Sequence, residues 1–312
     1  MKASHPLRVT VLRGGPSDEF EVSLKTGATV LEHIPKDSYH VQDIVIARDG
    51  VWHKNGVPIS PHKAISQADI VFNALHGAYG EDGKLQHILE LHRIPFTGSG
   101  SFASALAMNK VLAKELFKKN GIKTPHHKVA KPIDNLSGAD MVTLFRSFSL
   151  PFIVKPVSGG SSVGVTLVKD FASFEPALAR VFALDNDALI EEFIPGVEAT
   201  VGVIEDYRDH DLYALPPIEI RQSDEIVPGN FSHDVKKELE EIARNVHRAL
   251  DLSHYSSTDF IVTPKRGIFV LEVNTLPGLT SESLVPKALH SVGSSLSQFI
   301  DHLLRLAVGK KR

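Results

Sequence analysis

Short apolar strands alternate with helices over the first third of the chain, and this alternation constrains the fold more than any other feature of the sequence. Strands are predicted at 8–12, 41–47 and 69–75. A helix is predicted at 21–34, where apolar residues recur with helical spacing. Since strands that alternate with helices form parallel sheets covered by helices, we expect a doubly wound sheet here.

Glycine-rich segments follow two of these strands. Gly14-Gly15 ends the first strand, and the loop from His76 to Gly83 follows the third. In open sheets of this kind, ligands bind beyond the carboxyl ends of the strands. The two loops therefore mark one candidate binding edge. His76 is singled out among the histidines because it begins the second loop.

Strands and helices also alternate in the rest of the chain, with longer helices. One uninterrupted helix is predicted at 101–120, and further helices at 174–182, 233–250 and 296–308. The predicted strands are 152–155, 163–168, 188–194, 199–204, 258–262 and 268–274.

Composition excludes several classes of protein. The 312 residues hold 34 Lys and Arg against 37 Asp and Glu, and a net charge of −3 gives no attraction to nucleic acid or anionic membranes. The absence of cysteine excludes disulfides, thiol catalysis and cysteine-ligated zinc. No apolar run could span a membrane, and no signal peptide is evident. We therefore expect a soluble, cytoplasmic protein.

A predicted hairpin places two carboxylates face to face. With residues 264–267 as its loop, Val262 faces Phe269, and Asp259 faces Glu272. Like charges directly opposite on a sheet repel unless a cation lies between them.

A third oxygen ligand joins this pair. Asn274 lies two residues beyond Glu272 and therefore on the same face of the strand. Oxygen ligands without Cys or His are typical of Mg²⁺ or Mn²⁺. The hairpin thus predicts a metal site, and a protonated or hydrated acid pair is the alternative.

A glycine- and serine-rich loop follows the strand that ends at Lys155. Gly159-Gly160-Ser161-Ser162 can bring backbone N–H groups and hydroxyls close to an anion. A lone charge at the end of an apolar strand needs an anionic partner. The segment is therefore either a phosphate-binding flap or simply a mobile turn.

Taken together, several segments resemble the motifs of D-alanine–D-alanine ligases of the ATP-grasp superfamily, in the same order and over almost the whole chain. These segments are Glu21-Val-Ser-Leu24, residues 76–83, Gly98-Ser-Gly100 through Met108-Asn-Lys110, residues 153–164, residues 189–198 and residues 271–284.

The resemblance implies an α/β ATP-grasp fold in three parts. These are a doubly wound N-terminal domain at 1–97, a small central lid domain at 98–187, and a C-terminal α+β domain with the metal hairpin at 188–312.

The resemblance also implies roles for individual residues. Lys110 and Lys155 would hold the phosphates of ATP, and Glu198 the ribose. The rest of the nucleotide site would comprise Ile153, Ser161, Ser162, Glu191, Glu192, Ile194 and Leu271. The metal ligands Asp259, Glu272 and Asn274 would bind two Mg²⁺ ions.

The substrate residues follow from the same comparison. Glu21 would hold the ammonium of the first D-alanine, with His76 and Ser161 near it. Ser283 and Leu284 would receive the carboxylate of the second, and the Gly278 N–H would stabilise the oxyanion. Of these, Glu21, Ser161 and Gly278 are the catalytic candidates.

The implied activity is ATP-dependent joining of two D-alanines through an acyl phosphate, for peptidoglycan synthesis, by a homodimer that binds neither nucleic acid nor membrane. Two departures from the motifs of the family bear on this implied activity. Ser257 stands where the family has Arg, and the lid-loop motif is missing between Arg221 and Pro228. Arg221, Lys236 and Lys237 are candidate replacements. The alternatives are a ligase for another amino acid or hydroxy acid pair, and a degenerate nucleotide-binding protein.

Overall fold

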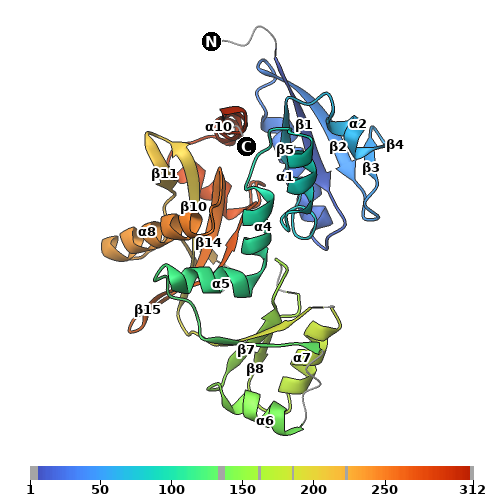
Figure 1. The fold of residues 1–312 in the computed structure, drawn as a ribbon. Coiled ribbons are helices and arrows are strands. Elements are labelled where there is room, and N and C mark those ends of the chain that lie inside the picture. The colour runs from blue at the N-terminus through green and yellow to red at the C-terminus, as the bar shows by residue number, and fades with distance from the viewer. Residues whose placement is uncertain (1–5, 133–137, 161–162, 185, 222–223, 310–312) are drawn as a thin grey trace.

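Three sheets and their covering helices build the protein in this computed structural model, which describes residues 6–132, 138–160, 163–184, 186–221 and 224–309 (Figure 1). None of the helices in these ranges is both long enough and apolar enough to cross a membrane.

The N-terminal sheet has five strands in the order β4-β3-β2-β1-β5. The strands are β1 (Leu7–Gly14), β2 (Tyr39–Ile46), β3 (Trp52–Lys54), β4 (Val57–Ile59) and β5 (Ile70–Asn73). The helices are α1 (Phe20–His33), α2 (Pro61–Ile65) and α3 (Lys84–Leu91). β1 pairs in parallel with β2 and β5, as the alternation predicted, and the short β3 and β4 add an antiparallel edge.

The central sheet has four antiparallel strands in the order β6-β9-β7-β8. These are β6 (His127–Ala130), β7 (Phe152–Pro156), β8 (Thr166–Val168) and β9 (Ala188–Glu192). Helices α6 (Gly138–Arg146) and α7 (Phe174–Phe182) cover it. Phe152 and Phe174 pack edge to face at its core. Because β9 hydrogen-bonds within this sheet, the sheet ends at Glu192, beyond the domain boundary expected at 187.

The C-terminal sheet has six strands, in the order β13-β12-β10-β14-β15 with β11 paired to β10. They are β10 (Val197–Tyr207), β11 (His210–Ala214), β12 (Ile218–Arg221), β13 (Asp224–Ile226), β14 (Tyr255–Thr263) and β15 (Gly267–Asn274). The helices are α8 (His233–Ala249), α9 (Leu284–Ser291) and α10 (Leu296–Gly309). Phe299 and Leu303 of α10 share one hydrophobic core with Val9 and Phe72 of the N-terminal sheet, so these two parts pack as one body.

The β14–β15 hairpin pairs Asp259 with Glu272, as predicted, although its register between that pair and the turn is shifted by one residue. Val262 pairs with Ile268, so the predicted partner Phe269 is wrong by one residue. A bulge directly after Asp259 takes up the extra residue of β15 and restores the predicted carboxylate pair.

The single helix predicted at 101–120 is in fact two helices, α4 (Ser101–Met108) and α5 (Lys110–Lys119). Between them Asn109 has φ −89° and ψ 101°, and its Oδ1 accepts hydrogen bonds from the N–H groups of Val111 and Leu112, both at 3.1 Å. The side chain thus satisfies donors that the start of a helix leaves free. The turn sends α5 across the end of α4 (Figure 1), which places Lys110 beside the central sheet.

Replacing Asn109 should show how much this turn depends on its cap. We expect Asn109→Ala to lower the free energy of unfolding by about 0.5–2 kcal/mol, because two N–H donors lose their acceptor. Asn109→Asp keeps an acceptor oxygen and should remain close to the unmodified protein in urea unfolding. Equal losses in both variants would show that the cap does not hold the turn.

Candidate active site

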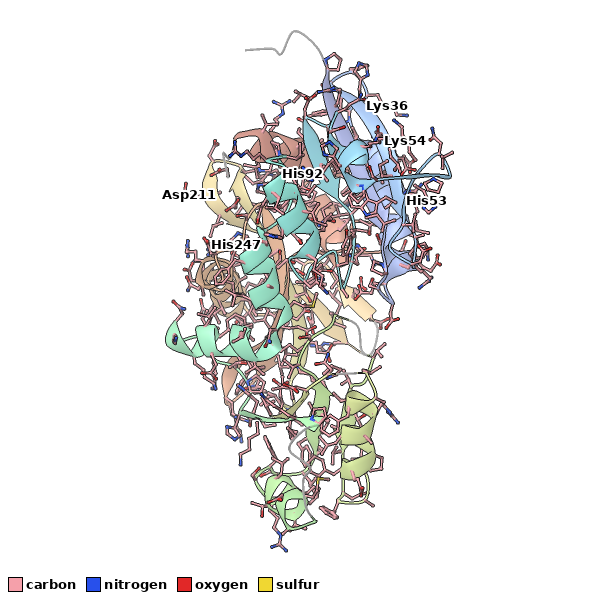
Figure 2. The ribbon with its side chains drawn as sticks, turned by 45° about the vertical axis from the view of Figure 1, so that its right-hand side comes forward. Lys36, His53, Lys54, His92, Asp211 and His247 are labelled. Carbon is pink, nitrogen blue, oxygen red and sulfur yellow. The ribbon has the colours of Figure 1, made fainter. Side chains whose placement is uncertain are left out.

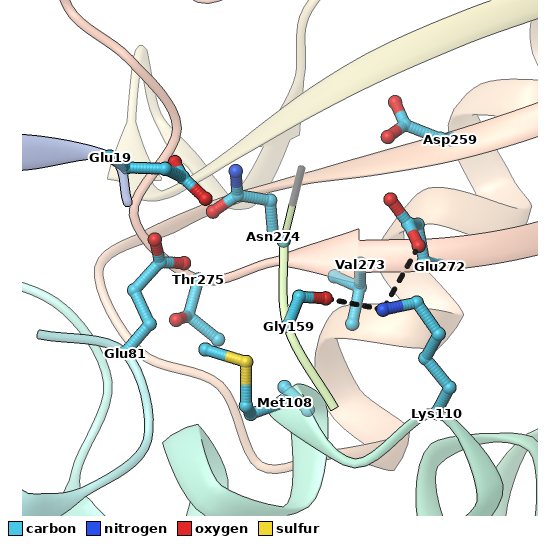
Figure 3. Close-up of a pocket in the computed structure, with 12 residues that line it drawn as sticks. Glu19, Glu81, Met108, Lys110, Gly159, Asp259, Glu272, Val273, Asn274 and Thr275 are labelled. Atoms are coloured by element: carbon cyan, nitrogen blue, oxygen red, sulfur yellow. Dashed lines mark hydrogen bonds and ion pairs between the residues drawn. The ribbon is translucent and has the colours of Figure 1, made fainter. Parts of the chain in front are cut away.

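Residues from all three sheets line two adjoining cavities of about 750 and 210 Å³. The residues common to both are Glu19, Lys110, Gly159, Gly160, Asp259 and Glu272. Figure 3 shows the smaller cavity, with four carboxylates and one lysine around it. Such an excess of negative charge suits a cationic ligand.

The N-terminal side of the site is formed by Glu19, His76 and Glu81, whose side-chain ligand atoms lie within 4.8 Å of one another. His76 is buried, with Nε2 2.8 Å from Thr26 Oγ1 and Nδ1 3.7 Å from Glu81 Oε1. Burial and the neighbouring Glu81 raise the pKa of Glu19. These two carboxylates both line the smaller cavity.

Glu21, the predicted substrate carboxylate, lies outside both cavities. It is exposed on α1 and pairs with Arg48 at 3.3 Å. Successive helical residues are about 100° apart around the axis, so residues two apart point in nearly opposite directions. Glu19, at the helix start, occupies the cavity instead. The sequence offered both acids, and only the direction of the first turn distinguishes them.

Asp259 and Glu272 project from adjacent strands into the same space (Figure 3). Burial and the facing Glu272 raise the pKa of Asp259 to about 7, although Asp259 accepts a 2.6 Å hydrogen bond from Thr200. Glu272 lies 3.6 Å from Lys110 Nζ. Asn274 lines the same cavity, and its Oδ1 accepts a 2.9 Å hydrogen bond from the Leu276 N–H. A carbonyl oxygen has a second lone pair, so Asn274 can still bind a cation.

The lysines lie on the side of the cavities toward the central sheet. Lys110 Nζ donates to the backbone carbonyl of Gly159, at the start of the glycine-rich loop. Burial lowers the pKa of Lys110, against the effect of Glu272. Lys155 Nζ is 2.7 Å from Glu191 Oε2, so the anionic partner expected for Lys155 is present within the protein.

A further lysine, Lys114, was not anticipated from the sequence. Its Nζ is 2.6 Å from the other oxygen of Glu191, and its side chain is 1% exposed. Lys114 is four residues after Lys110, so the two lie on one face of α5. This spacing was the available signal, hidden because a lysine in an amphipathic helix normally faces water.

The other predicted residues divide into three groups. Those that line the larger cavity are Ile153, Glu192, Ile194, Glu198, Leu271 and Leu284. Ser161 and Ser162 lie outside the described residues. Ser283 and Gly278 line neither cavity. Ser283 precedes α9, and its hydroxyl hydrogen-bonds with the hydroxyl of Thr280 at 2.8 Å. A Cβ atom added at Gly278 would lie 2.7 Å from the same Ser283 hydroxyl.

No arginine lines either cavity among the residues that the structure describes. Ser257 is buried on β14 and pairs with Asn274 across the hairpin. Arg221 pairs with Glu219 at the tip of the β12–β13 hairpin and is mostly exposed. Lys236 and Lys237 are on α8, away from both linings. The structure thus brings none of the suggested replacements to the cavity.

Comparison with known proteins connects this site to a family. The model "D-ala D-ala ligase N-terminus" matches residues 8–63 and 53–99, and "D-ala D-ala ligase C-terminus" matches 116–228 and 223–305. The D-alanine–D-alanine ligase of Geotalea uraniireducens is 37% identical over 97% of this chain and 96% of its own length. The chain belongs to the D-alanine–D-alanine ligase family. The enzyme of that name from Geobacter sulfurreducens is 36% identical over 95% of the chain and 93% of its own length.

Solved structures of this family confirm the predicted ATP-grasp fold. The D-Ala:D-Ser ligase VanG from Enterococcus faecalis superposes with a TM-score of 0.88 at 29% identity, covering 97% of this chain and 100% of the other. The D-alanine–D-alanine ligase from Bacillus anthracis, complexed with ATP, superposes with a TM-score of 0.84 at 28% identity, and the match covers 98% of each chain.

The carboxylate pair should make stability depend on pH and Mg²⁺. Because the folded pKa of Asp259, about 7, lies above its usual 3.8, its protonation stabilises the fold at low pH, and this contribution is lost as the pH rises through 7. We expect Mg²⁺ to raise the melting temperature more at pH 8 than at pH 5, since protons compete with it. Asp259→Asn should abolish most of this difference.

A matched control is Asp211→Asn, since Asp211 is exposed on the β10–β11 hairpin (Figure 2). It should respond to Mg²⁺ and pH as the unmodified protein does. A Mg²⁺ response that is equal at both pH values, or that survives in Asp259→Asn, would contradict the assignment of this pair.

Proposed function

We propose that this chain is an ATP-dependent ligase that joins two molecules of D-alanine for cell-wall peptidoglycan. The observation that supports it most is that Lys110, Lys155, Asp259 and Glu272 all line one cavity. Lysines and metal-binding acids around one cavity are the arrangement that phosphoryl transfer needs, because the reaction depends on positioning and on neutralising phosphate charge. Membership of the ligase family supplies the substrate class.

ATP would lie in the larger cavity, with its base toward β9 and its phosphates toward the glycine-rich loop. Ile194 and the backbone from Glu191 onward offer contacts for adenine, and Glu198 offers acceptors for the ribose hydroxyls. Lys110 and Lys155 would contact the phosphates. Lys110 also donates to the carbonyl of Gly159, which joins α5 to the start of the glycine-rich loop.

Mg²⁺ fits the carboxylate side of the cavity. Asp259, Glu272 and Asn274 present three oxygen donors, and burial beside Glu272 raises the pKa of Asp259, so a cation bound there would favour its charged form. These three residues would hold one or two ions. The metal would supply charge neutralisation on the transferred phosphate.

The first D-alanine would bind with its ammonium between Glu19 and Glu81. Both acids line the smaller cavity, and an ammonium there would relieve the repulsion that raises the pKa of Glu19. Its carboxylate would then point to the phosphates, accept the γ-phosphoryl group and become an acyl phosphate. This assignment replaces Glu21 with Glu19.

The second D-alanine would enter beside Leu284, with its carboxylate at the start of α9, where Ser283 precedes the first helical turn. Its amine would attack the acyl phosphate, and phosphate would leave.

The Gly278 N–H remains the proposed oxyanion donor. Ser257 lacks the guanidinium that the resemblance led us to expect, so this step has one fewer fixed charge. The cytoplasmic location and the homodimer belong to the same proposal.

The decisive experiment counts ADP, phosphate and dipeptide in one reaction with Mg-ATP and D-alanine. We expect D-alanyl-D-alanine, formed slowly and with more than one ADP per dipeptide. Loss of one preorganised oxyanion donor typically costs about 10²–10³ in kcat. A panel of D-serine, D-lactate and L-alanine tests the alternative acceptors.

Product formed only with D-serine (a dipeptide) or only with D-lactate (a depsipeptide) would replace D-alanine as the acceptor. ATP binding without any ligated product would indicate the degenerate homologue. Fast, one-to-one coupling would leave the ligase assignment intact and contradict the role given to Ser257.

The two acids of the first turn provide a matched pair of variants. Glu19→Gln should raise the KM for D-alanine by at least about tenfold, because the ammonium loses a buried charged partner worth 1.5–3 kcal/mol, while ATP affinity should change little. Glu21→Gln, on the exposed side of the same turn, should behave as the unmodified enzyme. The opposite pattern would restore Glu21 as the substrate residue.

A further inference from the structure

Lys114 is a buried ammonium that the proposed chemistry does not use. The residue is fully buried on α5, and its helical neighbours Ala113 and Phe117 pack into the hydrophobic core of the C-terminal sheet. Lysine is almost never fully buried unless it is paired. Its place about one turn after the start of α5 therefore requires an explanation.

The ammonium of Lys114 has two polar partners. Nζ lies 2.6 Å from Glu191 Oε1 and donates a 2.5 Å hydrogen bond to Thr124 Oγ1. Glu191 Oε2 in turn lies 2.7 Å from Lys155 Nζ. One carboxylate from the central sheet therefore lies between two ammonium groups, one on its own sheet and one on α5.

The charges of this cluster do not cancel. Two ammonium groups surround one carboxylate, which leaves a net charge of +1 at neutral pH. Burial lowers the pKa of Lys114 only to about 8, and despite burial the two lysines hold the pKa of Glu191 below its usual value. Lys114 and Glu191 are therefore both charged near pH 7. A buried excess positive charge beside a cavity favours an anionic ligand.

We propose that Lys114 is a positioning residue that leaves Lys155 available to the phosphates of the nucleotide. With Lys114 in place, Glu191 divides its charge between two lysines, and Lys155 retains capacity for a second anionic partner. Without Lys114, Glu191 and Lys155 form a neutral pair that competes with the phosphates. The inference rests on the proposed function only for the identity of ATP as the ligand.

A purely structural role is the competing explanation. The contact between Lys114 and Glu191 also joins α5 to the central sheet, so its loss could simply loosen the two parts. A structural tie would affect every ligand of the cavity alike. The proposed role affects ligands that carry phosphates, because only these use the ammonium of Lys155.

The test compares ATP with adenosine by calorimetry in the presence of Mg²⁺. We expect Lys114→Met, which keeps the length of the side chain, to weaken ATP binding by at least about tenfold, the effect of about 1.4 kcal/mol. Adenosine binding should change by less than about threefold, since it lacks phosphates. Lys114→Arg retains the charge and should stay within about threefold of the unmodified protein for ATP.

The matched control is Lys118→Met, one turn further along α5. Lys118 is half-exposed and pairs only with Glu115 among its described partners, at 2.7 Å, so the change should leave both ligands unaffected. A second readout comes from the double variant. In a protein that already carries Glu191→Gln, Lys114→Met should weaken ATP binding by less than about threefold.

Equal losses for ATP and adenosine would overturn the inference, as would unchanged ATP affinity with a lowered melting temperature. If Glu191→Gln fails to fold, the contrast between ATP and adenosine still decides the question. Because no D-alanine is present, the result is independent of ligation. A chain that follows this pattern but forms no dipeptide would contradict the proposed ligase activity alone.

Discussion

Repulsion between Asp259 and Glu272 determines how the rest of the site is organised. The hairpin register and its bulge bring the two carboxylates to adjacent positions, where burial makes the charge of Asp259 costly. Lys110 compensates only Glu272, at 3.6 Å. The remaining negative charge makes this part of the cavity suited to a cation, and Lys155, which lines the same cavity, is suited to phosphate. In the proposed function, these two groups together would hold a metal-bound nucleotide.

Elements with strong local patterns could be predicted from the sequence, and contacts set by tertiary packing could not. The parallel N-terminal strands and the helix Phe174–Phe182 were visible in their hydrophobic periodicity. The break at Asn109 was not, because the apolar pattern continues on both sides of it and only its side-chain cap ends the helix. The pair of Asp259 and Glu272 was predicted correctly from a shifted register, because a bulge corrected the shift.

The residues of the site also divide into those that the local sequence pattern predicted and those that depend on tertiary packing. The lysines and acids that end strands or line the hairpin were recognisable from their position, and they lie around the cavity. Glu21 was named from the motif resemblance, and Glu19 lines the cavity instead, because the orientation of one helical turn decides which acid faces it. Lys114 was missed because its burial comes from the packing of α5 against two sheets rather than from its neighbours in sequence.

The central sheet joins the rest of the protein through two short crossings of the chain. One runs from the end of α5 to β6, and the other from β9 to β10. The crossings lie side by side, because the N–H of Glu192 donates to the carbonyl of His126 at 3.0 Å and the N–H of His126 donates to Glu192 Oε1 at 3.0 Å. The chain therefore attaches the central sheet to the rest of the protein along one edge. A turn of the central sheet about this edge would change the width of the cavity and leave the internal geometry of each sheet unchanged.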